Sequence, residues 1–412
     1  MNAIKTSNQN EDKIFTIDFF LIFGALLFSS MVMYALMSTV TEYATSMGTS
    51  AAIAGLVSGI YIFGGLCSRI YSANALEKRN WNRLAIIFLS VHFFACIFYF
   101  FADNVYVLLL VRFIHGLGFG ATSTAIVTIA SAILPKKRFG EAFGYFMLGT
   151  TISVGLGPYI SGYFYDNWGA FGSFGLATTF AALGLLCILL LDIDKFESIH
   201  NAEIEKTIEN ESLAMEDGLE EKGKFRAILD RILEVPAVPV SLFVGLTSLG
   251  YVSILSFYRL YAAQVDLVGA FSIFFLLYSV VLLISRPIAG KIQDSYGDKI
   301  ICYTGIIAQS IGLFLIAFMP SSITVFICAV CAALGFGTLN SACTAIVTRN
   351  TTANRRPFAI STFFIFCDGT MGFGPALLGS FVSASSGYAP VYFISSFITL
   401  LALPIAIYAL RK

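Results

Sequence analysis

Two ionisable side chains stand inside one apolar stretch, LLLVRFIHGLGFG at residues 108–120. Arg112, His115 and Gly116 have the i, i+3 and i+4 spacing that places residues on one face of a helix. An arginine near the middle of a membrane helix costs about 2.5–3.5 kcal/mol on insertion scales, and such charges usually face a partner or a cavity. The sequence therefore predicts a functional site at Arg112, with His115 as a candidate proton carrier. Two alternatives stay open: Arg112 extends outward to the headgroups, or His115 is a neutral hydrogen-bonding group.

A second apolar stretch, ISTFFIFCDGTMGFGP at 360–375, carries Asp368, the only acidic residue deep in an apolar segment. Burial disfavours the charged form of a carboxyl group, so Asp368 is a candidate for proton coupling or substrate binding. The alternative is a structural pair with Arg112 or with a hydroxyl group of the other half of the chain. Tyr34 and Tyr251 stand in the middle of other apolar stretches, where they either line the same cavity or pack between helices.

These residues belong to a chain that is 57% hydrophobic and 12% charged, with a mean hydropathy of +0.82. Soluble domains carry about 25% charged residues, and a membrane-spanning helix needs about 17–25 apolar residues. The sequence predicts an all-α membrane protein with twelve such helices, because continuous apolar stretches exclude the alternating pattern of a β-barrel. The predicted spans are approximately 17–41, 51–71, 84–102, 105–130, 141–165, 169–191, 238–260, 267–289, 300–319, 322–347, 358–382 and 388–410.

The basic residues of the loops set the predicted orientation. With the N-terminus inside the cell, the cytoplasmic loops carry Lys78, Arg79, Arg83, Lys136, Lys137, Arg138, Lys291, Lys299, Arg349, Arg355 and Arg356. The opposite side then carries Arg259 with several acidic residues. This distribution follows the positive-inside rule and predicts a multi-pass protein of the cell membrane with both termini in the cytoplasm.

A polar, mostly acidic segment, residues 192–236, interrupts the apolar pattern and is typical of a linker. It divides the chain into an N-terminal six-helix bundle (1–191) and a C-terminal six-helix bundle (237–412). The bundles repeat at a constant offset of 217 residues: LGFG at 117–120 recurs at 334–337, and His92 maps onto Gln309, a pair expected to make polar contacts between helices. Six spans in each half predict a pseudo-two-fold axis along the membrane normal.

The loop after the eighth predicted span resembles the loop motif of the major facilitator superfamily. The motif positions are Gly290, Asp294, Gly297 and Lys299. The offset maps Glu77 onto Asp294 and Arg69 onto Arg286, although Ala73 stands where the family has a glycine in the first copy. The resemblance implies two six-helix bundles that transport by alternating access, with Arg69, Glu77 and their counterparts in gating and loop contacts.

Two further stretches resemble motifs of proton-coupled members of this family. Arg112 and His115 stand in a stretch similar to the fourth-helix motif, and GLGPYISG at 155–162 resembles the fifth-helix motif of antiporters that export drugs. The repeat supplies a second copy, GFGPALLG at 372–379. The motif residues are Gly157, Pro158 and Gly162 in the first copy and Gly374, Pro375 and Gly379 in the second. The resemblance implies proton-coupled efflux of a small organic molecule.

Glu42 and Arg259 are also separated by 217 residues, so they take equivalent places at the outer ends of the first and seventh predicted helices. We expect them to bridge the two halves when the outer side is closed. An exposed ion pair contributes about 0–1 kcal/mol. The alternative is two solvated loop charges.

The sequence favours a transporter over an enzyme. It has no phosphate-binding loop or nucleophile elbow, and the CxxC pair Cys328 and Cys331 lacks the further ligands of a zinc site, so no cofactor or metal is expected. The expected partners of this monomer are a small-molecule substrate, protons and membrane lipid, without nucleic acid. Competing hypotheses are proton-coupled uptake (symport) of a sugar, organic acid or other nutrient, and a membrane sensor that does not transport.

Overall fold

A computed structural model describes residues 13–78, 80–135, 139–198, 234–351, 356–383 and 387–411. Most of the predicted linker, residues 199–233, lies outside these ranges. The helices of the N-terminal half are α2 (Ile17–Ser46), α3 (Ala51–Lys78), α4 (Trp81–Phe98), α5 (Val105–Ile133) and α6 (Phe139–Leu189). Those of the C-terminal half are α9 (Val238–Gln264), α10 (Val268–Ser272), α11 (Phe274–Tyr296), α12 (Asp298–Phe318), α13 (Ser322–Ala332), α14 (Thr338–Arg349), α15 (Arg356–Gly379) and α16 (Ala389–Ala409).

Ten segments among the described residues are long and apolar enough to cross a membrane, and the protein is a multi-pass helical membrane protein. This number differs from the twelve expected from the sequence for two reasons. Helix α6 runs through the predicted spans 141–165 and 169–191 as one element of 51 residues, although Gly169 breaks its helical geometry with φ 66° and ψ −160°. Helix α15, which covers the predicted span 358–382, is not one of the ten.

Several helices begin where a short polar side chain accepts a hydrogen bond from the first turn. Asn104 accepts from the backbone N–H groups of Tyr106 and Val107 at the start of α5, and Thr16 accepts from Phe19 at the start of α2. Ser321 forms a capping box with Thr324 at the start of α13. These side chains satisfy N–H groups that lack partners within the helix, so each apolar helix starts at a defined residue.

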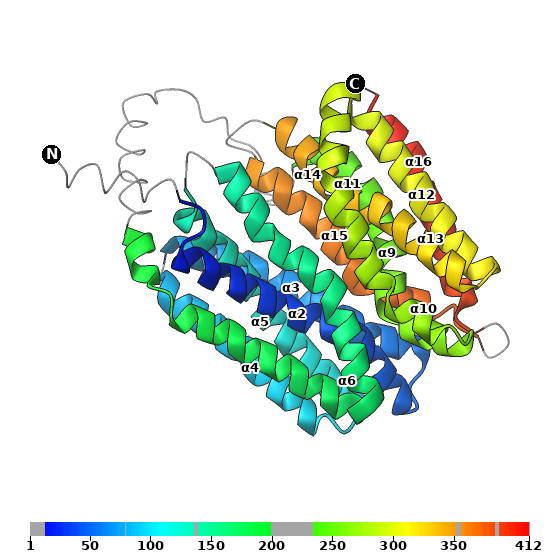
Figure 1. Cartoon of the computed structure of the whole chain (residues 1–412), viewed down its shortest axis with the longest axis horizontal. Helices are drawn as coiled ribbons and strands as arrows, with labels where there is room; N and C mark the ends of the chain where they lie inside the picture. Colours follow the sequence, from blue (N-terminus) through cyan, green and yellow to red (C-terminus); the bar gives the residue numbers. More distant parts are fainter. Residues whose placement is uncertain are drawn as a thin grey trace, which may run out of the picture.

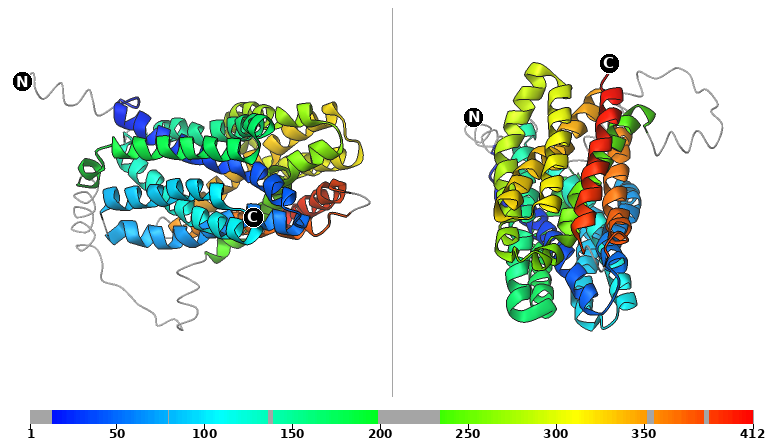
Figure 2. Two further views of the ribbon diagram at one scale, coloured as in Figure 1. Left: turned by 90° about the horizontal axis from the view of Figure 1, so that it is seen from below. Right: turned by 90° about the vertical axis from the view of Figure 1, so that its right-hand side faces the viewer.

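The helices of the two halves lie roughly parallel, with α2–α6 on one side and α9–α16 on the other (Figures 1 and 2). Each half has its own apolar clusters, and the largest cluster of the C-terminal half also takes in Met37, Tyr61, Phe119 and Val154 from the N-terminal half. The backbones of α3 and α15 approach closely, because a Cβ added at Gly59 would lie 1.7 Å from the carbonyl oxygen of Gly372. Small residues allow such contacts between membrane helices.

The repeat-related pair His92 and Gln309 differs in its contacts. Gln309 of α12 donates to the carbonyl oxygen of Thr247 (2.9 Å) and accepts from the N–H of Phe336 (2.8 Å). Phe336 belongs to a π-helical turn, Ala333–Gly337, between α13 and α14. His92 of α4 packs on the ring of His115 at 4.5 Å, but neither of its ring nitrogens has a partner among the described residues. The expected polar contact is therefore present at Gln309 and absent from the described surroundings of His92.

We predict that Gln309→Leu lowers the free energy of unfolding by about 1–3 kcal/mol, because the buried N–H of Phe336 would lose its acceptor. His92→Leu is the matched control at the equivalent position, and it should cost less, since it removes buried nitrogens that have no partner. Thermal unfolding of both variants in detergent tests this expectation. Equal losses at the two positions would contradict it.

Candidate functional site

Arg112 lies fully buried inside the N-terminal half, on α5. Its guanidinium donates to the carbonyl oxygens of Val57 (3.0 Å) and Ser58 (3.2 Å) on α3 and to the hydroxyl of Tyr99 (3.3 Å). It also stacks over the ring of Tyr61 at 4.3 Å. Neutral acceptors and an aromatic face thus compensate the charge. Arg112 does not extend outward to the headgroups, and the suggested pair with Asp368 is wrong, because Asp368 pairs with Arg69.

His115 is buried one helical turn from Arg112. Its Nδ1 lies 2.8 Å from the hydroxyl of Tyr99, and its Nε2 lies 3.5 Å from the sulfur of Cys96. Tyr99 therefore contacts both Arg112 and His115, and the three form a polar cluster between α3, α4 and α5. Ser58 connects this cluster to the other half, because its hydroxyl lies 3.2 Å from that of Ser256 on α9.

Asp368 forms an ion pair across the two halves. Its Oδ2 lies 3.3 Å from Nη1 of Arg69, which joins α15 to α3. The two side chains are 15% and 32% exposed, so the pair is neither sealed in the core nor freely solvated. The sequence suggests a loop and gating role for Arg69, but the structure places Arg69 within α3 as the partner of Asp368.

A repeat-related contact joins Arg286 of α11 to Thr151 of α6, with 3.3 Å between Nη1 and the hydroxyl oxygen. The offset of 217 residues maps Arg69 onto Arg286 and also maps Thr151 onto Asp368. The two contacts are thus equivalent, except that a hydroxyl takes the place of the carboxylate. We call these four residues the interface cluster. In both arginines Nε has no partner among the described residues, so each guanidinium retains a donor.

Tyrosines lie close to the interface cluster. Tyr34 of α2 is half-buried and packs against the apolar cluster of the C-terminal half. Tyr251 of α9 is buried, with its ring stacked on Phe336 at 4.7 Å and 5.5 Å from the ring of Tyr278. Tyr34 is therefore the more accessible member of this predicted pair, and Tyr278 is an aromatic neighbour that the sequence did not single out.

The ends of α2 and α9 meet in a second charged cluster. Nε of Arg259 lies 2.5 Å from Glu42, the predicted contact, and Nη2 lies 2.5 Å from Asp166 of α6. The ring of Tyr165 packs against the same guanidinium at 5.1 Å. We call Glu42, Asp166 and Arg259 the outer cluster. Asp166 was not predicted as a partner, because the repeat offset pairs residues one to one and gives no third member.

The fifth-helix motif packs against the C-terminal half. A Cβ added at Gly162 would lie 2.7 Å from Nη1 of Arg259, and the carbonyl oxygen of Pro158 accepts from the hydroxyl of Tyr258 at 3.4 Å. Gly157 leaves space for Tyr34, whose Cβ would lie 2.9 Å from an added Cβ. The absence of a side chain at Gly162 therefore admits the arginine of the outer cluster.

The second motif copy takes the equivalent place on α15. Added Cβ atoms at Gly374 and Gly379 would lie 3.2 Å from Val252 and 2.4 Å from the carbonyl oxygen of Ala51. The carbonyl oxygen of Pro375 would lie 2.2 Å from a Cβ at Gly55 of α3. Close contacts at both copies place the two motifs against neighbouring helices, and those to Gly55 and Ala51 cross the two halves.

The loop motif joins α11 to α12. Gly297 has φ 84°, a left-handed conformation that glycine adopts without strain, and Gly290 is a half-buried residue of α11. Asp298 next to the turn pairs with Arg349 at 2.5 Å, a contact that the sequence did not indicate. The backbones of Glu77 and Asp294 are helical, whereas their side chains lie outside the described set.

Charged clusters between two helical halves, within a multi-pass membrane protein, define the class of a membrane transporter. A family model described as Major Facilitator Superfamily matches residues 22–278 and 240–412. The chain belongs to this superfamily.

Named relatives and solved structures agree with that assignment. An uncharacterized MFS-type transporter of Methanocaldococcus jannaschii is 23% identical over 85% of this chain and 87% of its own length. The multidrug resistance efflux pump PmrA of Streptococcus pneumoniae is 22% identical over 72% of this chain and 70% of its own. A crystal structure of the nucleoside transporter NupG has a TM-score of 0.73, with 13% identity and coverage of 96% of this chain and 100% of that one. These proteins are transporters, and the chain is not an enzyme.

We predict that Arg259→Glu opens the end of the bundle that the outer cluster holds. A cysteine at position 256, where Ser256 is buried, reports the opening through its rate of alkylation by a water-soluble maleimide. Loss of about 1 kcal/mol corresponds to a rate increase of about fivefold. Combining this change with Glu42→Arg should restore part of the protection, since an opposite-charge pair forms again. Lys299→Glu is the control for net charge, and an unaltered rate in Arg259→Glu would contradict the prediction.

Gly162→Val should also raise the alkylation rate at position 256, because the new side chain would occupy the space of the Arg259 guanidinium. Gly175→Val on the same helix is the matched control, since an added Cβ there has no neighbour within 4 Å. If both variants behave alike, the close approach of Gly162 to Arg259 has no part in holding this end closed.

Proposed function

We propose that the protein is a secondary active transporter that exports a small organic molecule in exchange for protons, by alternating access between its two halves. The Arg69–Asp368 ion pair carries this proposal, because it joins α3 to α15 across the halves at 3.3 Å. A proton on the Asp368 carboxylate would remove its negative charge and weaken the attraction to Arg69. Proton binding at one side chain would thereby change the contact between the two moving parts.

The outer cluster supports the same proposal at the other end of the path. Arg259 holds Glu42 and Asp166 of the N-terminal half from α9 of the C-terminal half. With the outer ends joined, the interface cluster would communicate with the cytoplasmic side. Separation of the outer ends, together with closure of the inner ends, would then carry the substrate outward.

The proposal includes a definite architecture. Helix α6 contains two spans that meet at the break at Gly169, and α15 is a further span, which together give twelve helices in two bundles (residues 1–191 and 237–412) related by a pseudo-two-fold axis. The equivalent contacts Arg69–Asp368 and Arg286–Thr151 support this axis. The loop cations support a cell-membrane protein with both termini and the 192–236 linker in the cytoplasm.

Efflux is the preferred direction for two reasons. The relative PmrA is named a multidrug resistance efflux pump, and Gly157, Pro158 and Gly162 match the fifth-helix motif of exporting antiporters. The close contacts of this motif with Tyr34, Tyr258 and Arg259 support a role at the interface between the halves.

Proton-coupled uptake of an anionic nutrient is the second candidate, and one observation favours it. Arg286 faces the hydroxyl of Thr151 where its counterpart Arg69 faces a carboxylate. The interface cluster therefore has two guanidinium groups and one carboxylate. A carboxylate or phosphate of a substrate would balance the second guanidinium through charge-assisted hydrogen bonds.

We predict that Asp368→Asn abolishes transport driven by a pH gradient, because the amide cannot exchange the coupling proton. The measurement is accumulation of a panel of labelled compounds in everted vesicles with an imposed pH gradient, which also fixes direction and substrate class. Thr151→Asn is the matched control, since it places an amide at the repeat-related position that carries no charge in the native chain. Normal gradient-driven transport in Asp368→Asn would refute the coupling role.

A further inference from the structure

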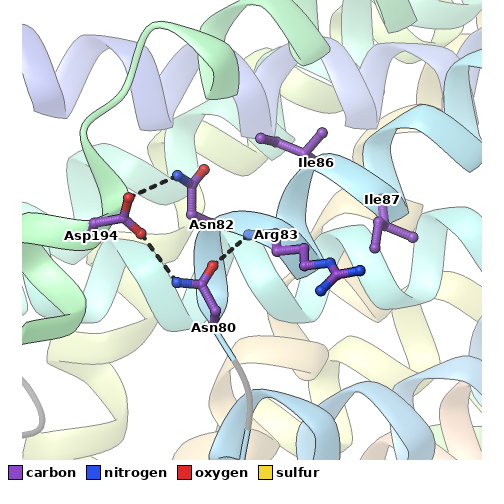
Figure 3. A pocket seen from close by; sticks show the side chains of 6 residues that line it. All are labelled: Asn80, Asn82, Arg83, Ile86, Ile87 and Asp194. Atoms are coloured by element: carbon purple, nitrogen blue, oxygen red, sulfur yellow. Dashed lines mark hydrogen bonds between the residues drawn. The ribbon is translucent and has the colours of Figure 1, made fainter.

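A polar pocket lies where α4 begins, on the side of the N-terminal half away from the interface cluster. Its volume is about 500 Å³, and it is lined by Asn80, Asn82, Arg83, Ile86, Ile87 and Asp194. The carboxylate of Asp194 accepts from the amides of Asn80 (3.3 Å) and Asn82 (3.1 Å). The side chain of Arg83 extends the other way, toward Ile87 (Figure 3). The pocket thus presents a cation and an anion that point to different parts of its rim.

The wall that carries Asp194 is fixed to α4. Glu197 accepts from the backbone N–H of Trp81 at 2.9 Å, and the neighbouring Ile193 and Phe196 are buried in the apolar cluster of the N-terminal half. Asp194 is therefore held in place beside α4. A carboxylate has about four acceptor positions, and the two amides occupy two of them.

A second hollow of about 410 Å³ continues from the first along α4, and the two share Ile86 and Ile87. Its lining is almost wholly apolar and reaches Phe94 and Phe98 of α4 and Ile114 of α5, all of which are exposed. From Ile86 to Phe98 the groove is about 18 Å long at 1.5 Å per residue. One leaflet of the hydrocarbon core is about 15 Å thick, half of the full core.

From these features we infer a binding site for one phospholipid whose headgroup carries a phosphate and a primary ammonium. The Arg83 guanidinium binds the phosphate, the remaining acceptor positions of Asp194 bind the ammonium, and an acyl chain lies in the groove between α4 and α5. A zwitterionic headgroup matches the opposite charges of the rim. A purely anionic headgroup would face the Asp194 carboxylate, and a quaternary amine has no N–H to donate. This site does not depend on the transport function.

The test is lipid binding to the purified full-length chain, measured by native mass spectrometry and by the shift in unfolding temperature. Phosphatidylethanolamine should be retained several-fold more than phosphatidylcholine, which differs only in its methylated amine, and more than phosphatidylglycerol, which is anionic. Equal retention of phosphatidylcholine would overturn the role of Asp194. Stronger retention of phosphatidylglycerol would show an anionic-lipid site in its place and overturn the proposal.

Variants locate the effect at this pocket. Arg83→Gln and Asp194→Asn should each remove the preference for phosphatidylethanolamine, while Arg83→Lys should keep most of it because the positive charge remains. Lys299→Gln is the control for loss of an exposed cation elsewhere. If Asp194→Asn does not fold, the comparison of Arg83→Gln with Arg83→Lys still decides. An unchanged preference in Arg83→Gln would reject the site.

Discussion

A charged side chain inside a bilayer needs a partner, and the position of that partner decides what the charge does in this protein. Arg112 finds carbonyl oxygens, a hydroxyl and an aromatic ring within its own half. It therefore holds α3 and α5 together. Arg69 and Arg259 find carboxylates across the two halves. Their contacts break when the halves separate, so the same electrostatic requirement that fixes one half internally also makes the interface reversible.

The seam between the halves combines these charges with glycine-lined helix contacts. Gly59 and Gly372 bring the backbones of α3 and α15 together, and Gly162 admits Arg259 between Glu42 and Asp166. Such surfaces interlock through shape and a few ion pairs, without a large shared apolar core to pull apart. An interface of this kind suits two parts that rock against each other, because its individual contacts are worth little.

The sequence predicted the helical membrane class, most helix positions and the Glu42–Arg259 contact. Hydropathy is a local property, and one offset located repeat-related positions, so these features needed no knowledge of packing. The partner of Asp368 was predicted wrongly, because helix periodicity does not show which helices face each other across the halves. A signal was available: the offset that pairs Arg69 with Arg286 also pairs Asp368 with Thr151. The merging of two spans in α6 depends on the backbone at Gly169, which hydropathy cannot show.

The account claims that the state of Asp368 controls how the two halves meet. Spin labels at Ser46 of α2 and Ala263 of α9, in a background without the eight native cysteines, measure the separation of the outer ends directly. The account predicts a short and a long distance in equilibrium, with proportions that change in Asp368→Asn. A single distance, identical in the native chain and the variant, would contradict it.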